Sequence, residues 1–289
     1  MRKLLFFSVA LAAAFTGLAQ TDSTNKSTTD TIKVGNFIII KDKNTSKKTT
    51  DKDNSNHAIN IIINKTNTPK KSNVQTNWWI FDLGFANYND QTNYANLAIN
   101  SYTPVINNST SINQNSFNLN TGKSSNVNIW VFMQKMNLIK HVVNLKYGAG
   151  LEMYNFRYEK NISYRNNPEP FVFTDSIHFS KNKLYTSYLT VPIMLNFNAT
   201  PNKKKGFNIS AGVSAGYLLS SYNKQISSER GKQKYRGNLN LSPWRLAGIA
   251  ELGLGPIRLY GSYSFNSLHD NKTQIEQYPY AVGIRFSNF

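Results

Sequence analysis

A period of two in hydrophobicity constrains the fold of this chain more than any other feature, and it runs through most of the sequence after Trp78. Apolar residues such as Ile257, Leu259 and Tyr263 recur at every second position, and the residues between them are small or polar. This alternation predicts β-strands with one apolar face. The eight predicted strands span 78–87, 126–138, 143–153, 189–197, 207–217, 244–254, 257–265 and 280–286.

The connections between these segments alternate between short and long. Short turns are predicted at 137–141, 200–206 and 255–256, and long polar stretches at 88–124, 160–180, 223–237 and 267–277. Several strands reach about nine residues, enough to cross a bilayer when tilted. Short turns at one end and long loops at the other are typical of outer-membrane barrels. The sequence therefore predicts an all-β fold, an eight-stranded antiparallel transmembrane β-barrel.

The second face of each strand separates a barrel in lipid from its alternatives, a soluble β-sandwich or a lipocalin-like barrel. That face carries Gly, Ser, Ala, Asn and Thr with isolated charges, which suits a narrow closed lumen better than a water-facing surface. Amphipathic rings near strand ends fit the headgroup level of a bilayer. These rings belong to Trp79, Tyr147, Tyr217, Trp244, Tyr263, Tyr280 and Phe286.

The N-terminus has the composition of a secretory signal peptide. Arg2 and Lys3 precede a short apolar stretch, and small residues follow up to Ala19. The next segment is polar and nearly free of aromatics, with two apolar islands at 34–40 and 58–63 that would fit one hairpin. The predicted organisation is a signal peptide at 1–19, a mostly disordered, flexible periplasmic extension at 20–77 and the barrel at 78–289.

Four of the predicted strands carry recognisable motifs. They read LKYGAGLE at 145–152, YLTVPIMLNF at 188–197, ISAGVSAGYL at 209–218 and YPYAVGIRF at 278–286. With these motifs, the region 78–289 resembles the PorT-like outer-membrane β-barrel proteins of Bacteroidetes. The resemblance implies an integral outer-membrane protein that the barrel-assembly machinery inserts, and it brings no catalytic residues.

Charged residues on the inward face form the first candidate site. A charge in a narrow lumen needs a partner or water, so we expect a salt-bridge network that plugs the barrel; a selective pore lined by Arg is the alternative. Glu251 is the expected partner of Arg258. The predicted lumen charges are Asp82, Lys146, Glu152, Arg245, Glu251, Arg258 and Arg285.

The net charge of +18 suggests an anionic partner. Export from the cytoplasm argues against nucleic acid and favours anionic lipid, lipopolysaccharide or acidic glycans. One external loop concentrates cations around a single acid, Glu229, and is a candidate for contact with lipopolysaccharide phosphates. Its basic residues are Lys224, Arg230, Lys232, Lys234 and Arg236. A second run, Lys203-Lys204-Lys205, falls in a predicted periplasmic turn and is expected to be solvated.

Evidence for catalysis is sparse in the sequence. A lipid-modifying enzyme would need Ser, His and a carboxylate together, and Ser267-Leu268-His269-Asp270 supplies those residue types. Neighbours in a strand point to opposite faces, so a polar loop start is the simpler interpretation. The chain has no Cys, and its four His are scattered over the extension, a turn and two loops, so we expect no metal and no cofactor.

The function that these patterns favour is a non-enzymatic structural or interaction role in the cell envelope. We expect a monomer in the outer membrane, in contact with membrane lipid. A narrow porin-like channel for small solutes is the alternative, followed by a lipid-modifying outer-membrane enzyme.

Overall fold

The computed structural model describes residues 30–34, 37–41, 72–97, 101–106, 109–201 and 206–287. The chain divides into two compact units, 1–71 and 72–289. In the first, β1 (Asp30–Val34) pairs antiparallel with β2 (Phe37–Lys41). This hairpin differs from the one suggested by the sequence, which used the two apolar islands as its strands: the first island is instead divided between β1 and β2. The signal peptide and the second island lie outside the described residues.

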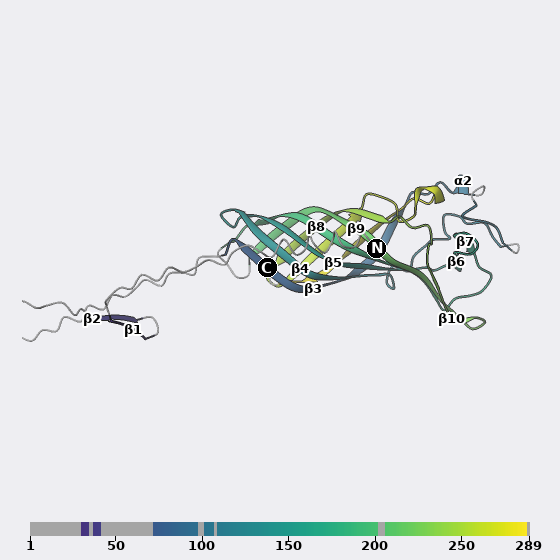
Figure 1. Ribbon diagram of the computed structural model, residues 1–289. Helices are drawn as coiled ribbons and strands as arrows, with labels where there is room; N and C mark the ends of the chain where they lie inside the picture. The colour runs from purple at the N-terminus through teal and green to yellow at the C-terminus, as the bar shows by residue number, and fades with distance from the viewer. Residues whose placement is uncertain are drawn as a thin grey trace, which may run out of the picture. The chain divides into compact units, whose positions relative to one another are not determined.

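The second unit is a closed β-barrel in which each strand is antiparallel to the next (Figure 1). The last barrel strand pairs with the first along ten residues, for example Gly283 with Gly84, and this pairing closes the sheet. The predicted eight-stranded antiparallel barrel is confirmed. Its strands are β3 (Val74–Asp90), β4 (Ser125–Ile139), β5 (Val143–Arg157), β8 (Lys181–Asn198), β9 (Phe207–Ser227), β11 (Trp244–Leu254), β12 (Ile257–Ser264) and β13 (Gln277–Phe286).

Side chains alternate between the lumen and an apolar outer surface, as the period of two requires. On β12, Leu259 is 55% exposed on the outside, whereas Arg258 is 1% exposed in the lumen. Small inward residues leave room for large ones across the lumen: a Cβ atom on Gly84 would lie 2.5 Å from the hydroxyl of Tyr260. The outward apolar band runs around the barrel through residues such as Leu189, Val213, Trp244, Leu252, Val282 and Phe286.

Two irregularities interrupt the alternation of side chains on β3 and β4. Trp79 has a left-handed φ of 56°, and it and Trp78 both lie on the outside. On the adjacent strand, the register shifts between Trp130 and Phe132. A bulge adds a residue and reverses the phase beyond it, so the segment 126–138 fits neither phase throughout.

The long connections fold against one another at one end of the barrel, on the right of Figure 1. This packed unit, called the cap below, consists of the described parts of 91–124, 158–180, 228–243 and 265–276 with the adjoining strand ends. Its elements are α2 (Tyr94–Leu97), β6 (Ile162–Arg165), β7 (Phe171–Thr174), β10 (Gly231–Arg236) and η2 (Asn271–Thr273). The sequence predicted a polar loop at 223–237, whereas the structure has a hairpin there, because β9 continues to Ser227 and pairs with β10.

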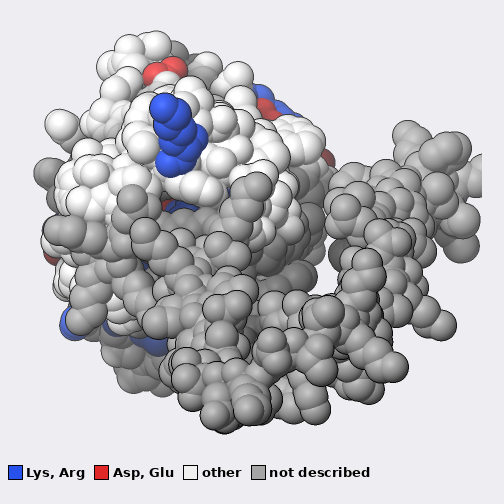
Figure 2. Space-filling view, turned by 90° about the vertical axis from the view of Figure 1, so that its left-hand side faces the viewer, with Lys and Arg blue, Asp and Glu red and all other residues white. Residues whose placement is uncertain are grey.

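The opposite end carries the short turns and is the end seen in Figure 2. Most of the described surface there is white, that is, neither acidic nor basic. None of the helices in the described residues is long and apolar enough to span a bilayer.

Candidate functional site

The lumen contains all seven of the charges that the alternation placed there. Three are acidic and four are basic, and each keeps 4% or less of its surface exposed. They come from β3, β5, β11, β12 and β13, so strands from around the barrel converge on one interior cluster. Its members, the lumen cluster, are Asp82, Lys146, Glu152, Arg245, Glu251, Arg258 and Arg285.

Arg285 joins two carboxylates across the lumen. Its Nε donates to Oδ1 of Asp82 at 2.7 Å, and its Nη2 donates to Oδ2 at 2.6 Å, a two-point contact that fixes both groups. Its Nη1 donates to Glu251, which also accepts from Lys146. The result is a continuous chain of four charges in which both carboxylates meet cations.

The third carboxylate of the lumen cluster, Glu152, has its own cation, and this pair joins β5 and β11, the strands that also hold Lys146 and Glu251. Arg245 donates from Nη1 to Oε2 of Glu152 at 2.9 Å and from Nη2 to the hydroxyl of Ser262 at 3.2 Å. Thr190 donates to the same Glu152 oxygen at 3.1 Å. The guanidinium also lies 4.9 Å from the ring centre of Tyr154, which provides a cation–π contact.

Arg258 requires a correction to the prediction that Glu251 is its partner. The carboxylate of Glu251 receives Lys146 and Arg285, whereas Nη1 of Arg258 donates to Asn208. The register explains the difference, because Arg258 stands opposite Gly253 rather than opposite Glu251.

Neutral polar groups complete the cluster and fill the space around it. Oδ2 of Asp82 accepts from Asn128 at 3.0 Å and from the indole of Trp130 at 2.7 Å. A cavity of about 10 Å³ remains beside Trp130, Glu251 and Arg285. That volume is on the order of one water molecule, so the lumen beside the cluster is packed with side chains.

The cap has an interior of a different kind, made of rings and aliphatic side chains. The hydroxyl of Tyr164 lies 2.9 Å from that of Tyr158 and 3.2 Å from Nε2 of His269, whose ring stacks on Tyr164. Burial lowers the pKa of His269 to about 3, so the ring is neutral at pH 7. Other buried residues of this core are Leu97, Tyr102, Ile112, Phe117, Phe156, Ile162, Val172, Leu184, Leu239 and Leu268.

The residues of the suspected triad each have other partners. The hydroxyl of Ser267 donates to the carbonyl of Ile275 at 2.9 Å, and the ring of His269 meets Tyr164. The carboxylate of Asp270 accepts from the backbone of Lys272 at 3.1 Å and caps η2. These contacts make the segment a loop start, the simpler of the two interpretations.

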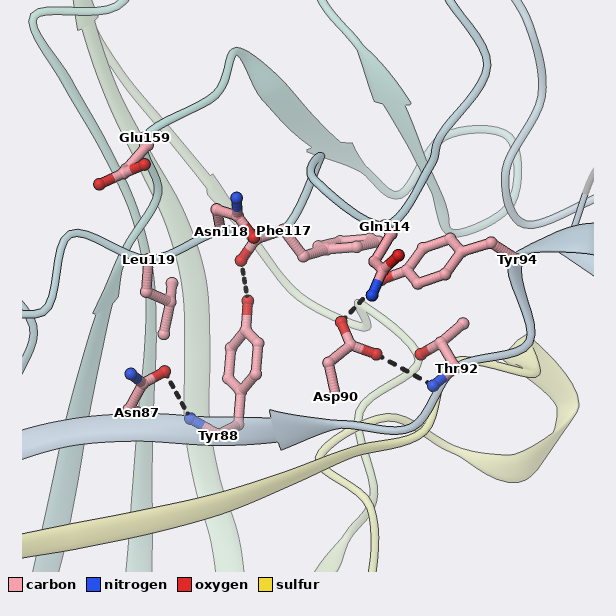
Figure 3. A pocket seen from close by; sticks show the side chains of 10 residues that line it. All are labelled: Asn87, Tyr88, Asp90, Thr92, Tyr94, Gln114, Phe117, Asn118, Leu119 and Glu159. Carbon is pink, nitrogen blue, oxygen red and sulfur yellow. Dashed lines mark hydrogen bonds between the residues drawn. The ribbon is translucent and has the colours of Figure 1, made fainter.

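An open recess of about 340 Å³ lies on the cap (Figure 3). Asp90 sits in it and accepts from the backbone N–H of Thr92 at 3.0 Å and from the hydroxyl of Tyr94 at 2.6 Å. Burial and Asp90 raise the pKa of Tyr94, so the phenol stays protonated. The remaining lining residues are Asn87, Tyr88, Gln114, Phe117, Asn118, Leu119 and Glu159. The recess is polar and adjoins water, and the polar groups of Asp90 and Tyr94 are already satisfied within it.

The predicted basic loop is the hairpin of β9 and β10, and its five cations do not act alike. Arg230 contacts another part of the cap, where its Nη1 donates to Asp175 at 2.8 Å. Lys232, Lys234 and Arg236 are exposed on β10, and Lys224 is half-buried on β9. The strand register adds two cations that sequence reasoning missed, Lys183 and Arg157. Lys183 of β8 lies opposite Lys224, and Arg157 of β5 lies opposite Lys183.

Metal binding finds no support in the residues that the structure describes, which hold no group of three potential ligands. His141 lies in the turn between β4 and β5, and His178 is exposed before β8. The run Lys203-Lys204-Lys205 lies outside the described ranges, as do His57 and the C-terminal Phe289.

Comparison with known families gives one match. The model of a family described as an outer membrane protein beta-barrel domain matches residues 82–272. That range begins inside β3 and ends in the cap after β12, and it includes six of the seven lumen charges together with the complete β9–β10 hairpin. Asp82 is its first residue, whereas Arg285 lies beyond it. No curated protein matches the chain.

Proposed function

Since this chain belongs to the outer membrane protein beta-barrel domain family and is thus an outer-membrane barrel protein, we propose that its role is structural or one of interaction, without catalysis. The observation that carries this proposal is the lumen cluster. A charge chain from Lys146 through Glu251 and Arg285 to Asp82 crosses the interior and leaves little free space beside it. A blocked lumen favours a membrane anchor over a channel.

The cap supports an interaction role. It is a folded unit with its own apolar core, so it presents a fixed surface instead of mobile loops. We propose that the cap lies outside the cell and that the short turns lie in the periplasm, as in barrels of this type. The signal peptide at 1–19 and the periplasmic extension at 20–77 belong to the same proposal, as does the finer assignment to PorT-like proteins of Bacteroidetes.

The proposed partners follow from the location. The apolar outer band contacts membrane lipid, and the barrel-assembly machinery inserts the protein as a monomer. The proposal includes no nucleic acid and no cofactor. Lipopolysaccharide is the anionic partner that the exposed cations favour.

Orientation can be tested by labelling single cysteines, because the chain has none of its own. Lys272→Cys places a thiol on the cap, and Lys140→Cys places one in a short turn. An impermeant maleimide should label the first in intact cells and the second only after the outer membrane is permeabilised. The opposite pattern would reverse the orientation.

Channel and enzyme activity are tested separately. The purified protein should give no stepwise conductance in planar bilayers, and reproducible steps would favour the porin-like alternative. Mass spectrometry of lipid A and phospholipids from a deletion strain should match the parent strain. A missing acyl or phosphate modification would point to the lipid-modifying enzyme.

A further inference from the structure

Four cations form one row across four neighbouring strands. Arg157 of β5 pairs with Lys183 of β8, Lys183 pairs with Lys224 of β9, and Lys224 pairs with Lys234 of β10. We call these four residues the basic row. With strands about 4.8 Å apart, the row is roughly 14 Å long. Like charges directly opposite one another on a sheet destabilise it, so this arrangement calls for an explanation.

The row lies on the outward side of the sheet. The neighbours of its members along each strand, Asn182, Leu184, Asn223 and Gln225, are buried on the inward side. Lys183 donates to the amide oxygen of Asn155, and Nη2 of Arg157 donates to the carbonyl of Ser180 at 2.6 Å. These acceptors are neutral.

Within the described residues, no member of the row forms an ion pair. Asp175 pairs with Arg165 and Arg230, and Glu229 at the hairpin tip is exposed. Further cations, Lys181 and Lys232, stand one step farther along the same face, on either side of Ile226.

Aromatic and apolar residues next to the basic row indicate its depth relative to the bilayer. The next outward pair toward the barrel is Tyr185 with Tyr222, whose rings stack with centres 4.6 Å apart. Lys234 Nζ lies 3.7 Å from the centre of the Tyr222 ring. Beyond this pair the outer surface becomes apolar, with Leu189 and Leu219 exposed. Amphipathic rings of this kind sit at the headgroup level of a bilayer, so the basic row faces the polar layer just above.

The electrostatics of the row fit an anion as ligand. Partial burial together with Lys181, Lys224, Lys234 and Arg157 lowers the pKa of Lys183, which lies beyond the apolar band, to about 8. Neighbouring cations also contribute to the lowered pKa values of Lys224 and Lys234. An anion in contact with the row would relieve this repulsion, and phosphate offers several acceptor oxygens to Lys and Arg.

We propose that the basic row binds the phosphate groups of an anionic glycolipid in the outer leaflet around the barrel. The surrounding geometry matches such a ligand: acyl chains would lie along the apolar band, the sugar against the Tyr185–Tyr222 pair and the phosphates on the row. The proposal rests on the outward orientation of the cap given above.

The test is native mass spectrometry of the full chain in detergent, titrated with bisphosphorylated lipid A in the presence of a chelator. Lys183→Gln, Lys224→Gln and Lys234→Gln are combined in one variant. Its matched control combines Lys123→Gln, Lys160→Gln and Lys272→Gln, three exposed lysines of the cap, and has the same net charge. We expect the row variant to bind at least about tenfold more weakly than the native chain, and the control to bind like the native chain.

Two further arms use the native chain alone, so they do not depend on how the variants fold. The native chain should bind dephosphorylated lipid A as weakly as the row variant binds bisphosphorylated lipid A. Millimolar inorganic phosphate should not displace bisphosphorylated lipid A from the native chain. The proposal would be overturned if the native chain bound both lipids equally, or if the row variant and the control lost equal affinity. Displacement of the lipid by free phosphate or by a soluble acidic polysaccharide would also overturn it. Cysteine labelling in intact cells reports on orientation, and conductance of the purified native chain reports on the lumen, so a failure of the proposed function would be seen separately.

Discussion

The lumen and the cap have different interiors: charged and polar side chains dominate the lumen cluster, whereas aromatic and aliphatic side chains dominate the cap core. Along β5, the inward residues Lys146 and Glu152 belong to the lumen cluster, whereas Tyr154 and Phe156, farther along the same face, belong to the cap core. What changes along the strand is the surroundings of the barrel wall. Lipid surrounds the wall at the cluster, and water surrounds the cap.

This difference follows from where the hydrophobic effect operates. Inside a bilayer, an apolar side chain gains little by turning inward, because lipid tails are equally apolar. Most apolar residues of the strands therefore remain outside, and the lumen is held mainly by ion pairs and hydrogen bonds, beside one small apolar cluster of Ile80, Trp130, Met133 and Met194. The cap projects into water, where burying rings is favourable, so its core resembles that of a soluble domain. The following predictions test this contrast.

The largest effect is expected in the lumen. Arg285→Met leaves Asp82 and Glu251 short of a cation in the interior, and such a loss costs about 3–5 kcal/mol. The free energy of unfolding should be measured with urea in phospholipid vesicles by tryptophan fluorescence. Adding Asp82→Asn should restore part of the loss, because the double variant has one fewer unpaired charge.

The control for Arg285→Met is Ser214→Ala, on the inward face of β9. The hydroxyl of Ser214 is buried without a hydrogen-bond partner among the described residues. Its removal should change the free energy of unfolding by about 1 kcal/mol or less. Strict additivity of the Arg285 and Asp82 substitutions would contradict the ion-pair account of the lumen.

The next effect concerns the outer wall at the depth of the lumen cluster. Val213 lies midway between Phe207 and Tyr217 on the outward side of β9 and is 55% exposed. Val213→Arg should lower the free energy of unfolding by about 2–4 kcal/mol, since lipid cannot solvate the charge. Ser220→Arg, at an exposed position of the same strand beyond the apolar band, should cost about 1 kcal/mol or less. Equal costs would mean that the band does not face lipid.

Lowering the pH should destabilise the cap and leave the stability of the lumen cluster unchanged. In the folded cap, burial lowers the pKa of His269 to about 3, whereas its ordinary pKa is 6.5. Between pH 6.5 and pH 3, His269 is therefore protonated only when the cap is unfolded. Stability is thus fully present above pH 6.5 and is lost as the pH falls toward 3. Going from pH 7 to pH 5 should cost the cap about 2 kcal/mol.

Hydrogen exchange of the cap amides, corrected for the intrinsic effect of pH, measures this change. His269→Gln should remove most of the dependence on pH, because Gln does not titrate. Exchange in the strands at the lumen cluster serves as the internal reference. A native cap with equal protection at both pH values would refute a coupling to His269.

The smallest effect is expected for a single hydroxyl of the cap core. Tyr164→Phe keeps the ring that stacks on His269 but removes the hydroxyl between Tyr158 and His269. The cap should lose about 1 kcal/mol. Hydrogen exchange of Val172 and its neighbours measures the loss, and the heat-dependent gel mobility of the barrel should not change. A loss spread equally over the barrel would show that cap and lumen unfold together.

The sequence predicted the barrel well because period two is a local signal. Each inward charge shares the phase of its own strand, so Asp82 and Arg285 were placed in the lumen without knowledge of their neighbours. Their pairing depends on register, and register is a property of two strands. For this reason Glu251 was assigned to Arg258, whereas it contacts Lys146 and Arg285.

The cap and the basic row were missed for related reasons. Cap core residues such as Leu97, Phe117 and Leu268 stand singly in polar segments, where no period marks them as buried. The row joins residues from four strands, and the phase of β9 reverses between Tyr217 and Tyr222, where the register with β8 shifts. Extending the alternation beyond the apolar band therefore gave no guide to which side Lys224 occupies.

The hairpin that carries the row has a consequence for self-association. Among the described strands, β10 pairs with β9 alone, so its other edge offers unpaired backbone groups to a strand of another molecule. Exposed edges of this kind promote strand pairing between molecules unless charged side chains prevent it. Lys232, Lys234 and Arg236 occupy alternate positions along that edge. Two such edges would repel each other, so we expect the cations on β10 to keep neighbouring copies of the protein from joining their sheets in a crowded membrane.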